Sequence, residues 1–161
     1  MPEQREPPRY VGMFKHLDKE GGFSLWLPTG WYRTDMTNGH HGVIYSPYPG
    51  DLNTCFSAEK KKLRYTVLEK DVPTLREGFE AGLAALPGVE IEKRDESVTS
   101  TLITLEARFT FLEGEARRKR WVRVVYWGDG QLILIAQGAT PEEFDYWLPM
   151  FFNTMMTVEI H

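Results

Sequence analysis

Apolar and polar residues alternate most regularly between Ile103 and Phe111, where every second residue is apolar and the intervening residues are polar or charged. Alternation with a period of two predicts a strand with one buried face. Glu113-Gly114 follows this strand and predicts a tight turn. If these two residues form the whole loop, Phe111 lies opposite Ala116 and Ile103 lies opposite Val124 in a long hairpin.

A second hairpin is predicted at Asp129-Gly130, a dipeptide that is typical of two-residue turns. With this turn, Val124 faces Ile135 on one side of the ribbon, and Trp127 faces Leu132 on the other side. Both faces of the hairpin are therefore apolar near the turn. A sheet with two apolar faces needs a covering layer on each side.

The first predicted helix begins at Thr74, which has capping-box spacing to Glu77. Pro87-Gly88 ends the helix, because proline cannot continue it and glycine tolerates the exit conformation. The apolar residues at helical spacing form one stripe: Leu75, Phe79, Leu83 and Leu86.

The second predicted helix has Thr140 as its N-cap, Pro141 at the first helical position and Glu143 as the partner in a capping box. Pro149 lies inside the helical pattern, so we expect the helix to kink or end there. Its apolar stripe supplies the second covering layer: Phe144, Trp147, Leu148 and Phe151.

The remaining extended segments are shorter and are bounded by turn residues. They are predicted at 23–27, 42–48, 53–62 and 89–93, with a short strand or extended tail at 155–160. Short connections make most strands antiparallel neighbours. We predict an α/β (α+β) fold, a twisted and mainly antiparallel sheet sandwiched between helices. Residues 1–20 are expected to be a flexible N-terminal arm, and residues 21–161 a single domain.

The composition of the chain changes this picture little. Its 161 residues, 42% hydrophobic and 26% charged, are ordinary for one globular domain. A net charge of −4 argues against a surface for nucleic acid or anionic membranes. A single cysteine excludes an internal disulfide and a multi-cysteine zinc site. We find no apolar segment of signal-peptide or membrane-span length, so we expect a cytoplasmic protein.

The layout of the chain resembles the PsbP-like superfamily. The segment Gly21 to Trp31, with its Pro28-Thr29-Gly30-Trp31 turn, is similar to the family's opening strand, and the mid-chain helix, long hairpins and late helix follow in the same order. This group includes the extrinsic photosystem II subunit, a eukaryotic Ran-binding import factor and bacterial DcrB-type proteins. The resemblance implies a protein-binding or accessory domain, and no family active site maps onto these residues.

The residues that could carry chemistry are few. His40 and His41 lie in a turn-rich loop, and adjacent side chains on an extended chain point to opposite sides, so we interpret them as exposed loop histidines and not as metal ligands. Cys55 is interpreted as a buried structural thiol. No phosphate loop, nucleophile elbow or zinc-protease motif is present. We therefore predict no enzyme activity, metal or cofactor.

A candidate partner surface is centred on the basic run of the first hairpin. In the predicted register, Lys119 lies opposite Arg108, and Lys60 to Lys62 join the cluster if their strand lies nearby. The simpler interpretation is a charged strand end that discourages edge-to-edge aggregation. Aromatic rings at otherwise polar positions extend the surface. Its residues are Trp121, Arg117, Arg118, Lys119, Arg120 and Trp26.

The function predicted from these observations is non-catalytic binding of another protein. The alternative is a small-molecule or lipid carrier, with an apolar pocket between sheet and helix lined by Phe109, Phe111 and Tyr126. A third hypothesis is an enzyme that uses His40 or His41 as a general base. A homodimer through an aromatic sheet face or the 155–160 tail is a further hypothesis. We expect no nucleic-acid partner and no membrane span.

Overall fold

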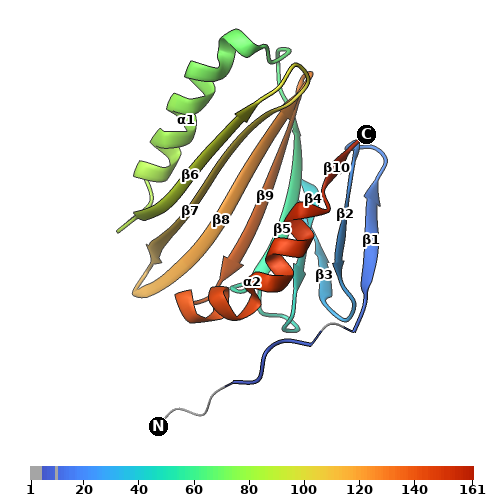
Figure 1. Cartoon of the computed structure of the whole chain (residues 1–161), viewed down its shortest axis with the longest axis vertical. Coiled ribbons are helices and arrows are strands. Elements are labelled where there is room, and N and C mark those ends of the chain that lie inside the picture. Colours follow the sequence, from blue (N-terminus) through green and yellow to red (C-terminus); the bar gives the residue numbers. More distant parts are fainter. Residues whose placement is uncertain (1–4, 10) are drawn as a thin grey trace.

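The computed structural model of the chain describes residues 5–9 and 11–161. Within these residues it contains ten strands, two α-helices and one short 3-10 helix, η1 (Figure 1). In chain order the elements are β1 (Met13–Asp18), β2 (Phe23–Pro28), β3 (Tyr32–Asp35), β4 (His41–Ser46), β5 (Cys55–Lys62), η1 (Glu69–Asp71), α1 (Val72–Ala84), β6 (Glu90–Val98), β7 (Ile103–Glu113), β8 (Ala116–Trp127), β9 (Gly130–Gly138), α2 (Pro141–Met156) and β10 (Glu159–Ile160).

The strands form two antiparallel sheets. The larger has the order β3-β4-β5-β9-β8-β7-β6, and the smaller has the order β1-β2-β10. Figure 1 shows α1 beside β6 and β7, whereas α2 crosses in front of β9 and β5 next to the small sheet. The predicted class, a mainly antiparallel α+β sandwich, is confirmed. The sequence pattern did not reveal that a second sheet shares one side with α2.

The strand β1 lies inside the segment 1–20 that we expected to be a flexible arm. It pairs with β2 along its whole length, from Met13 opposite Pro28 to Asp18 opposite Phe23. The Phe14 ring also packs 5.4 Å from the ring of Tyr45. The folded unit therefore includes residues before 21, and residues 1–4 and 10 of the expected arm lie outside the described residues.

One face of the large sheet is covered by α1. Val124 and Tyr126 of β8 lie on this face with exposed fractions of 6% and 7%, and Leu75 and Leu83 of α1 pack against it. Two bidentate ion pairs, Arg76–Glu96 and Arg94–Glu80, join α1 to the edge strand β6. The helical stripe predicted for this segment is therefore confirmed as the inward face of α1.

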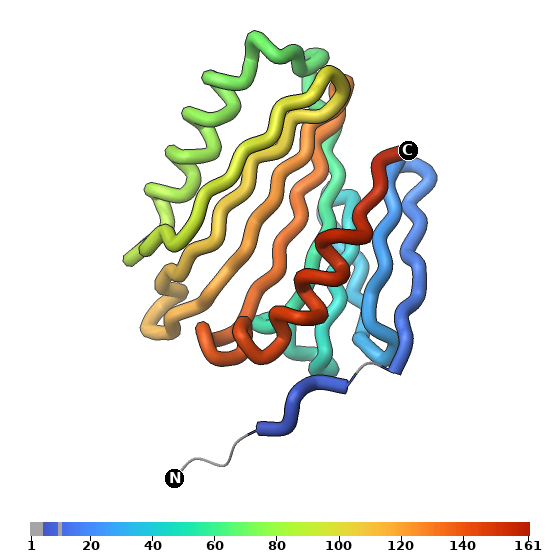
Figure 2. The backbone as a smooth tube through the Cα atoms, viewed as in Figure 1, coloured from blue at the N-terminus to red at the C-terminus, as the bar shows by residue number. Residues whose placement is uncertain are grey.

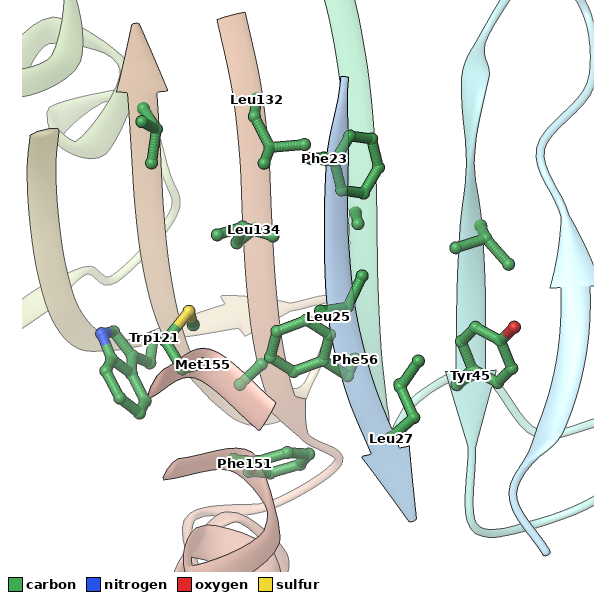
Figure 3. Close-up of a cluster of buried hydrophobic side chains, with 14 of the residues drawn as sticks. Phe23, Leu25, Leu27, Tyr45, Phe56, Trp121, Leu132, Leu134, Phe151 and Met155 are labelled. Carbon is green, nitrogen blue, oxygen red and sulfur yellow. The ribbon is translucent and has the colours of Figure 1, made fainter. Parts of the chain in front are cut away.

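The opposite face is covered by α2 and the small sheet. Leu132 and Leu134 of β9 are fully buried there, in one cluster with Phe151 of α2 and with Phe23 and Leu25 of β2 (Figure 3). The hairpin β8–β9 is thus apolar on both faces and has a helix over each, as predicted. Figure 2 shows the segment 5–9, in dark blue, which precedes the first residue of β1 in the chain and extends past that end of the strand.

The register of both long hairpins differs from the prediction by two residues. Phe111 lies opposite Arg118 and not Ala116, and Val124 lies opposite Ile133 and not Ile135. In each hairpin the first loop residue is a glycine with positive φ, Gly114 at 64° and Gly128 at 55°. Glycine takes this conformation without steric cost, so it selects the loop position. We had placed the loops one residue too early and one residue too late, respectively.

The helix boundaries also differ from the prediction. The first helix begins earlier, with Asp71 as N-cap, so Thr74 lies inside α1 and does not cap it. Thr140 does cap α2, because its side-chain oxygen accepts a hydrogen bond from the Glu143 amide. Of the two outcomes expected at Pro149, a kink or an end, the end is excluded, because α2 continues through this residue to Met156. Burial of Phe151 and Met155 in the core offsets the cost of about 3 kcal/mol for an internal proline.

Candidate functional site

Trp121, the centre of the predicted partner surface, is buried, with an exposed fraction of 3%. Its indole nitrogen donates a 2.6 Å hydrogen bond to Glu106, and its ring lies between the Arg108 guanidinium at 4.7 Å and the Phe152 ring at 6.4 Å. The side chain lies next to Met155, in the second half of α2 (Figure 3). Trp121 is therefore part of the core, because α2 covers the strand face that we had interpreted as polar.

The basic run of β8 does not form one surface either. Arg118 and Arg120 lie opposite Phe111 and Phe109 on the α1 face, whereas Lys119 points to the other face, where its ammonium lies 5.0 Å from the Phe144 ring. Alternation along a strand separates these side chains.

Each basic side chain of this run also has an intramolecular partner. Arg117 donates to the Gly88 carbonyl, Arg118 to the Ala139 carbonyl and Arg120 to the Gln137 side chain. Lys119 pairs with Glu92 and Asp145. Burial lowers the pKa of Arg120. These charges therefore serve contacts within the fold.

The other members of the predicted surface lie elsewhere. Trp26 is 42% exposed on β2, where its backbone amide donates to the Thr157 hydroxyl. Lys60 to Lys62 pair with the start of β9, at Gly130, whereas Lys119 pairs with its end, at Gly138. The lysines end β5, which pairs antiparallel with β9, so they lie beside the start of β9. The arginine run begins β8, which also pairs antiparallel with β9, so it lies beside the end of β9.

His40 and His41 lie in a groove at the lysine end of the sheet. His40 Nδ1 lies 2.6 Å from a Glu59 oxygen, and His41 Nε2 lies 2.6 Å from an Asp18 oxygen. The two rings reach different strands, β5 and β1, as expected for neighbours on an extended chain. A cavity of about 730 Å³ lies between these histidines, Lys60 to Lys62 and the turn at Asp129.

This groove pairs imidazoles with carboxylates but brings no hydroxyl or thiol nucleophile to them among the described residues. Its lining contains no serine, threonine or cysteine among the described residues. Cys55 is buried, as predicted, and burial raises the pKa of its thiol to about 11. Within the described part of the chain, no group of three or more histidine, cysteine or acidic residues is placed to hold a metal ion. The groove therefore contains two histidine–carboxylate pairs and lacks the hydroxyl or thiol of a Ser–His or Cys–His nucleophilic site.

The pocket required by the carrier hypothesis is filled by side chains. Phe109, Phe111 and Tyr126 are 1%, 4% and 7% exposed and pack in one cluster with α1. Side chains next to an empty cavity large enough for a ligand would keep accessible surface. The structure therefore places these three residues in a packed core layer.

A further site, which our sequence analysis did not find, lies where the segment 5–9 crosses the beginning of α2. The Arg5 guanidinium lies over the Tyr146 ring, 3.6 Å from its centroid. It also pairs with Glu143 and donates a 2.6 Å hydrogen bond to the Tyr48 hydroxyl. Burial opposes the charge of Arg5, but the hydrogen bonds to Tyr48 and Glu143 outweigh it and raise the pKa of the guanidinium. One arginine is thus recognised through its face and its edge.

The residues that receive Arg5 are held in place by their own contacts. Trp147 lies at the centre, with the rings of Trp31, Tyr48 and Tyr146 packed edge-on against it at 5.6, 6.1 and 4.9 Å. Its indole nitrogen donates to Glu143 at 3.0 Å, and the Tyr48 hydroxyl donates to the same carboxylate oxygen at 2.8 Å. We call these five residues the arm groove. Its carboxylate is oriented by two donors that do not depend on Arg5.

The arm groove extends along the segment that follows Arg5. A cavity of about 340 Å³ lies between Pro7 and Pro8 on one side and Trp31, Trp147 and Met150 on the other. The sequence contained partial signals for this site: the Pro-rich opening with two arginines, Tyr48 between two prolines, and Glu143 four residues before Trp147. These signals lie far apart in the chain, so only the fold brings them together.

No family model and no curated protein sequence matches the chain. Solved structures do match it. Cyanobacterial PsbP (CyanoP) from Synechocystis sp. PCC 6803 is 12% identical, with a TM-score of 0.65 over 97% of this chain and 98% of that chain. LpqN of Mycobacterium tuberculosis, described as involved in cell envelope biogenesis, is 13% identical, with a TM-score of 0.64 over 94% and 92%.

A eukaryotic protein has the same architecture. The Ran-binding protein Mog1p of Saccharomyces cerevisiae is 8% identical, with a TM-score of 0.54 over 92% of this chain and 95% of that chain. Similarity at this level of identity concerns the fold. Neither helix of the described chain has the length and apolar character needed to span a membrane. The sheet order, the two covering helices and these matches together show that the chain has the PsbP-like fold.

Proposed function

We propose that this chain is a non-catalytic binding domain that holds an extended segment of another protein in the arm groove. The observation that carries the proposal is the way in which the groove receives the segment 5–9. An arginine is stacked on Tyr146 and paired with Glu143, and two prolines cross an aromatic cavity. Grooves lined by aromatic residues commonly bind proline-rich segments, which are extended before binding and lose little entropy on docking.

The structural neighbours are consistent with a binding role. One of them, Mog1p, is described as a Ran-binding protein, and the fold carries that function there without implying the same partner here. The His40/His41 groove supports the enzyme hypothesis less, because its described lining supplies no hydroxyl or thiol for the histidines to activate. Homodimer formation, absence of nucleic-acid binding and a cytoplasmic location remain predictions.

The proposal is tested by titrating the full chain carrying Arg5→Ala with pools of extended, proline-containing peptides at millimolar concentration. The five tryptophan indole N–H signals in NMR spectra serve as probes. We expect the signals of Trp31 and Trp147 to shift and that of Trp26, on the small sheet, to stay. If no pool shifts either groove signal, or if only Trp26 responds, this site does not bind peptides.

Two glutamates in the first turn of α2 provide a matched pair of variants. Glu143→Gln removes the charge that faces the groove, whereas Glu142→Gln removes an exposed charge next to it. Both substitutions change the net charge equally and leave the helix dipole environment similar. We expect peptide-induced shifts to weaken in Glu143→Gln and to persist in Glu142→Gln.

A further inference from the structure

We infer that the segment 5–9 is an intramolecular latch on the arm groove, and that the partner segment which displaces it presents an arginine ahead of prolines. The inference rests on the proposed function and names the chemistry of the ligand and the control of access. The segment itself, Arg5-Glu6-Pro7-Pro8-Arg9, shows that chemistry.

The receiving groups select arginine over lysine. The guanidinium plane lies on the Tyr146 ring, one nitrogen donates to Tyr48, and another pairs with Glu143. These three contacts need a flat cation with donors along its edge. An ammonium group is a point charge and can meet the carboxylate or the ring, but it cannot present a flat face to one and a fork to the others.

The residues that contact Arg5 also contact one another, which favours a groove that is preorganised for arginine. Tyr48 and Trp147 donate to one oxygen of Glu143, which leaves the other oxygen to pair with Arg5. The aromatic rings hold each other edge-on, and Trp31 also packs against the buried Phe151. A preorganised site of this kind loses little entropy when a ligand binds.

Arg5 supplies the polar contacts that hold the arm. In the described part of the chain, the polar contacts between residues 5–9 and the rest of the fold all come from Arg5. Arg9 pairs with Glu6 inside the arm, and both side chains are 85% exposed. Replacement of Arg5 alone therefore opens the groove in the full-length chain, and Arg9→Ala is a matched control that removes an arginine without opening it.

The expected effect follows from the tether. A segment linked to its site has an effective concentration on the order of 1 mM. If the arm and a free peptide of the same sequence share a dissociation constant of about 100 µM, the arm fills the groove about ten times as often as it leaves it open. The apparent affinity of the free peptide for the wild-type chain therefore falls about tenfold.

The experiment measures fluorescence polarisation of a labelled peptide with the sequence of residues 5–9 added to full-length chains. We expect the Arg5→Ala chain to bind it about tenfold more tightly than the wild-type chain, and the Arg9→Ala chain to bind like wild type. Glu143→Gln in the Arg5→Ala background should lose at least tenfold in affinity, whereas Glu142→Gln in that background should not. A peptide with lysine at its first position should bind more weakly than the arginine peptide.

Three results would overturn the inference. Equal affinity of the wild-type and Arg5→Ala chains would show that the arm does not guard the groove. Equal binding of the arginine and lysine peptides, or no effect of Glu143→Gln, would show that arginine is not the recognised group. The NMR titration with peptide pools tests the proposed function separately. If any extended peptide shifts the Trp147 indole signal, the groove binds peptides even when the latch or the arginine preference is refuted.

Discussion

Gly138 is the residue where a single added methyl group should be most disruptive. It ends β9, just before α2 begins, and it is buried. A Cβ at this position would lie 2.6 Å from both Cα and Cβ of Phe144, and closer still to the Phe144 amide nitrogen. These atoms belong to the first turn of α2, so the neighbour is a backbone and not the end of a flexible side chain.

The size of the effect follows from this distance. Ordinary contacts of a Cβ begin near 3.4 Å, so α2 must move by about 1 Å to clear the Phe144 amide nitrogen, the closest of these atoms. Phe144 is fully buried and packs against Phe151, so the movement disturbs the core. Overpacking of this kind costs about 1–3 kcal/mol. The smaller entropy of the unfolded alanine chain offsets about 0.4–1 kcal/mol of it.

Gly82→Ala is the matched control. Gly82 lies inside α1, and a Cβ there meets no atom within 4 Å. Alanine in the interior of a helix is more stable than glycine by about 0.5–1 kcal/mol. The same substitution should therefore destabilise the protein at residue 138 and stabilise it at residue 82.

Urea unfolding followed by circular dichroism measures both variants, and calorimetry adds the midpoint temperature. A chain of this size shifts by about 2–4 °C for each kcal/mol. We expect a lower midpoint for Gly138→Ala, a higher one for Gly82→Ala, and unchanged denaturant slopes. A Gly138→Ala chain as stable as wild type would refute the close approach of β9 and α2, and with it the placement of the arm groove.

Three further predictions concern the core and two titratable groups. Phe151→Ala, which empties a fully buried site, should lower the free energy of unfolding in urea by about 3–5 kcal/mol. Phe152→Ala, at the neighbouring half-exposed residue, should lower it much less. Similar losses in the two variants would contradict the orientation of α2. Burial and the nearby Arg33 lower the pKa of His16, so the unfolded chain binds more protons and stability should fall as the pH drops below about 6.5. His16→Gln should flatten that part of the stability profile, and an unchanged slope would count against it. Burial raises the pKa of Cys55 from 9.0 to about 11, so iodoacetamide should alkylate the native thiol slowly at pH 8 and rapidly in urea, and stability should fall as the pH rises above 9; fast native alkylation would show an open site.

The elements themselves were largely readable from local patterns. The period-two alternation of Ile103 to Phe111 and the helical stripe of Phe144 to Phe151 each specify which side chains face the core, since the backbone geometry determines the spacing. The Thr140 cap was also predictable, because it depends on a hydroxyl and an amide three residues apart.

The hairpin registers were not determined by these patterns. A shift of two residues leaves every side chain on the same face of the sheet, so alternation cannot distinguish the predicted register from the observed one. The glycine that adopts positive φ makes the difference, and in both hairpins that is the first loop residue, Gly114 or Gly128. Burial likewise decided that α2 continues past Pro149.

Local patterns along the chain were thus sufficient to predict the kind of element that most segments form and the face that each buries, because both depend on neighbours within a few residues. The folded arrangement was needed to show that Trp121 is buried against α2, that β1 joins a second sheet, and that Arg5, Tyr48 and Glu143 meet in one groove. These outcomes depend on contacts between residues that are distant in the chain, and no local pattern of apolar and polar positions records them.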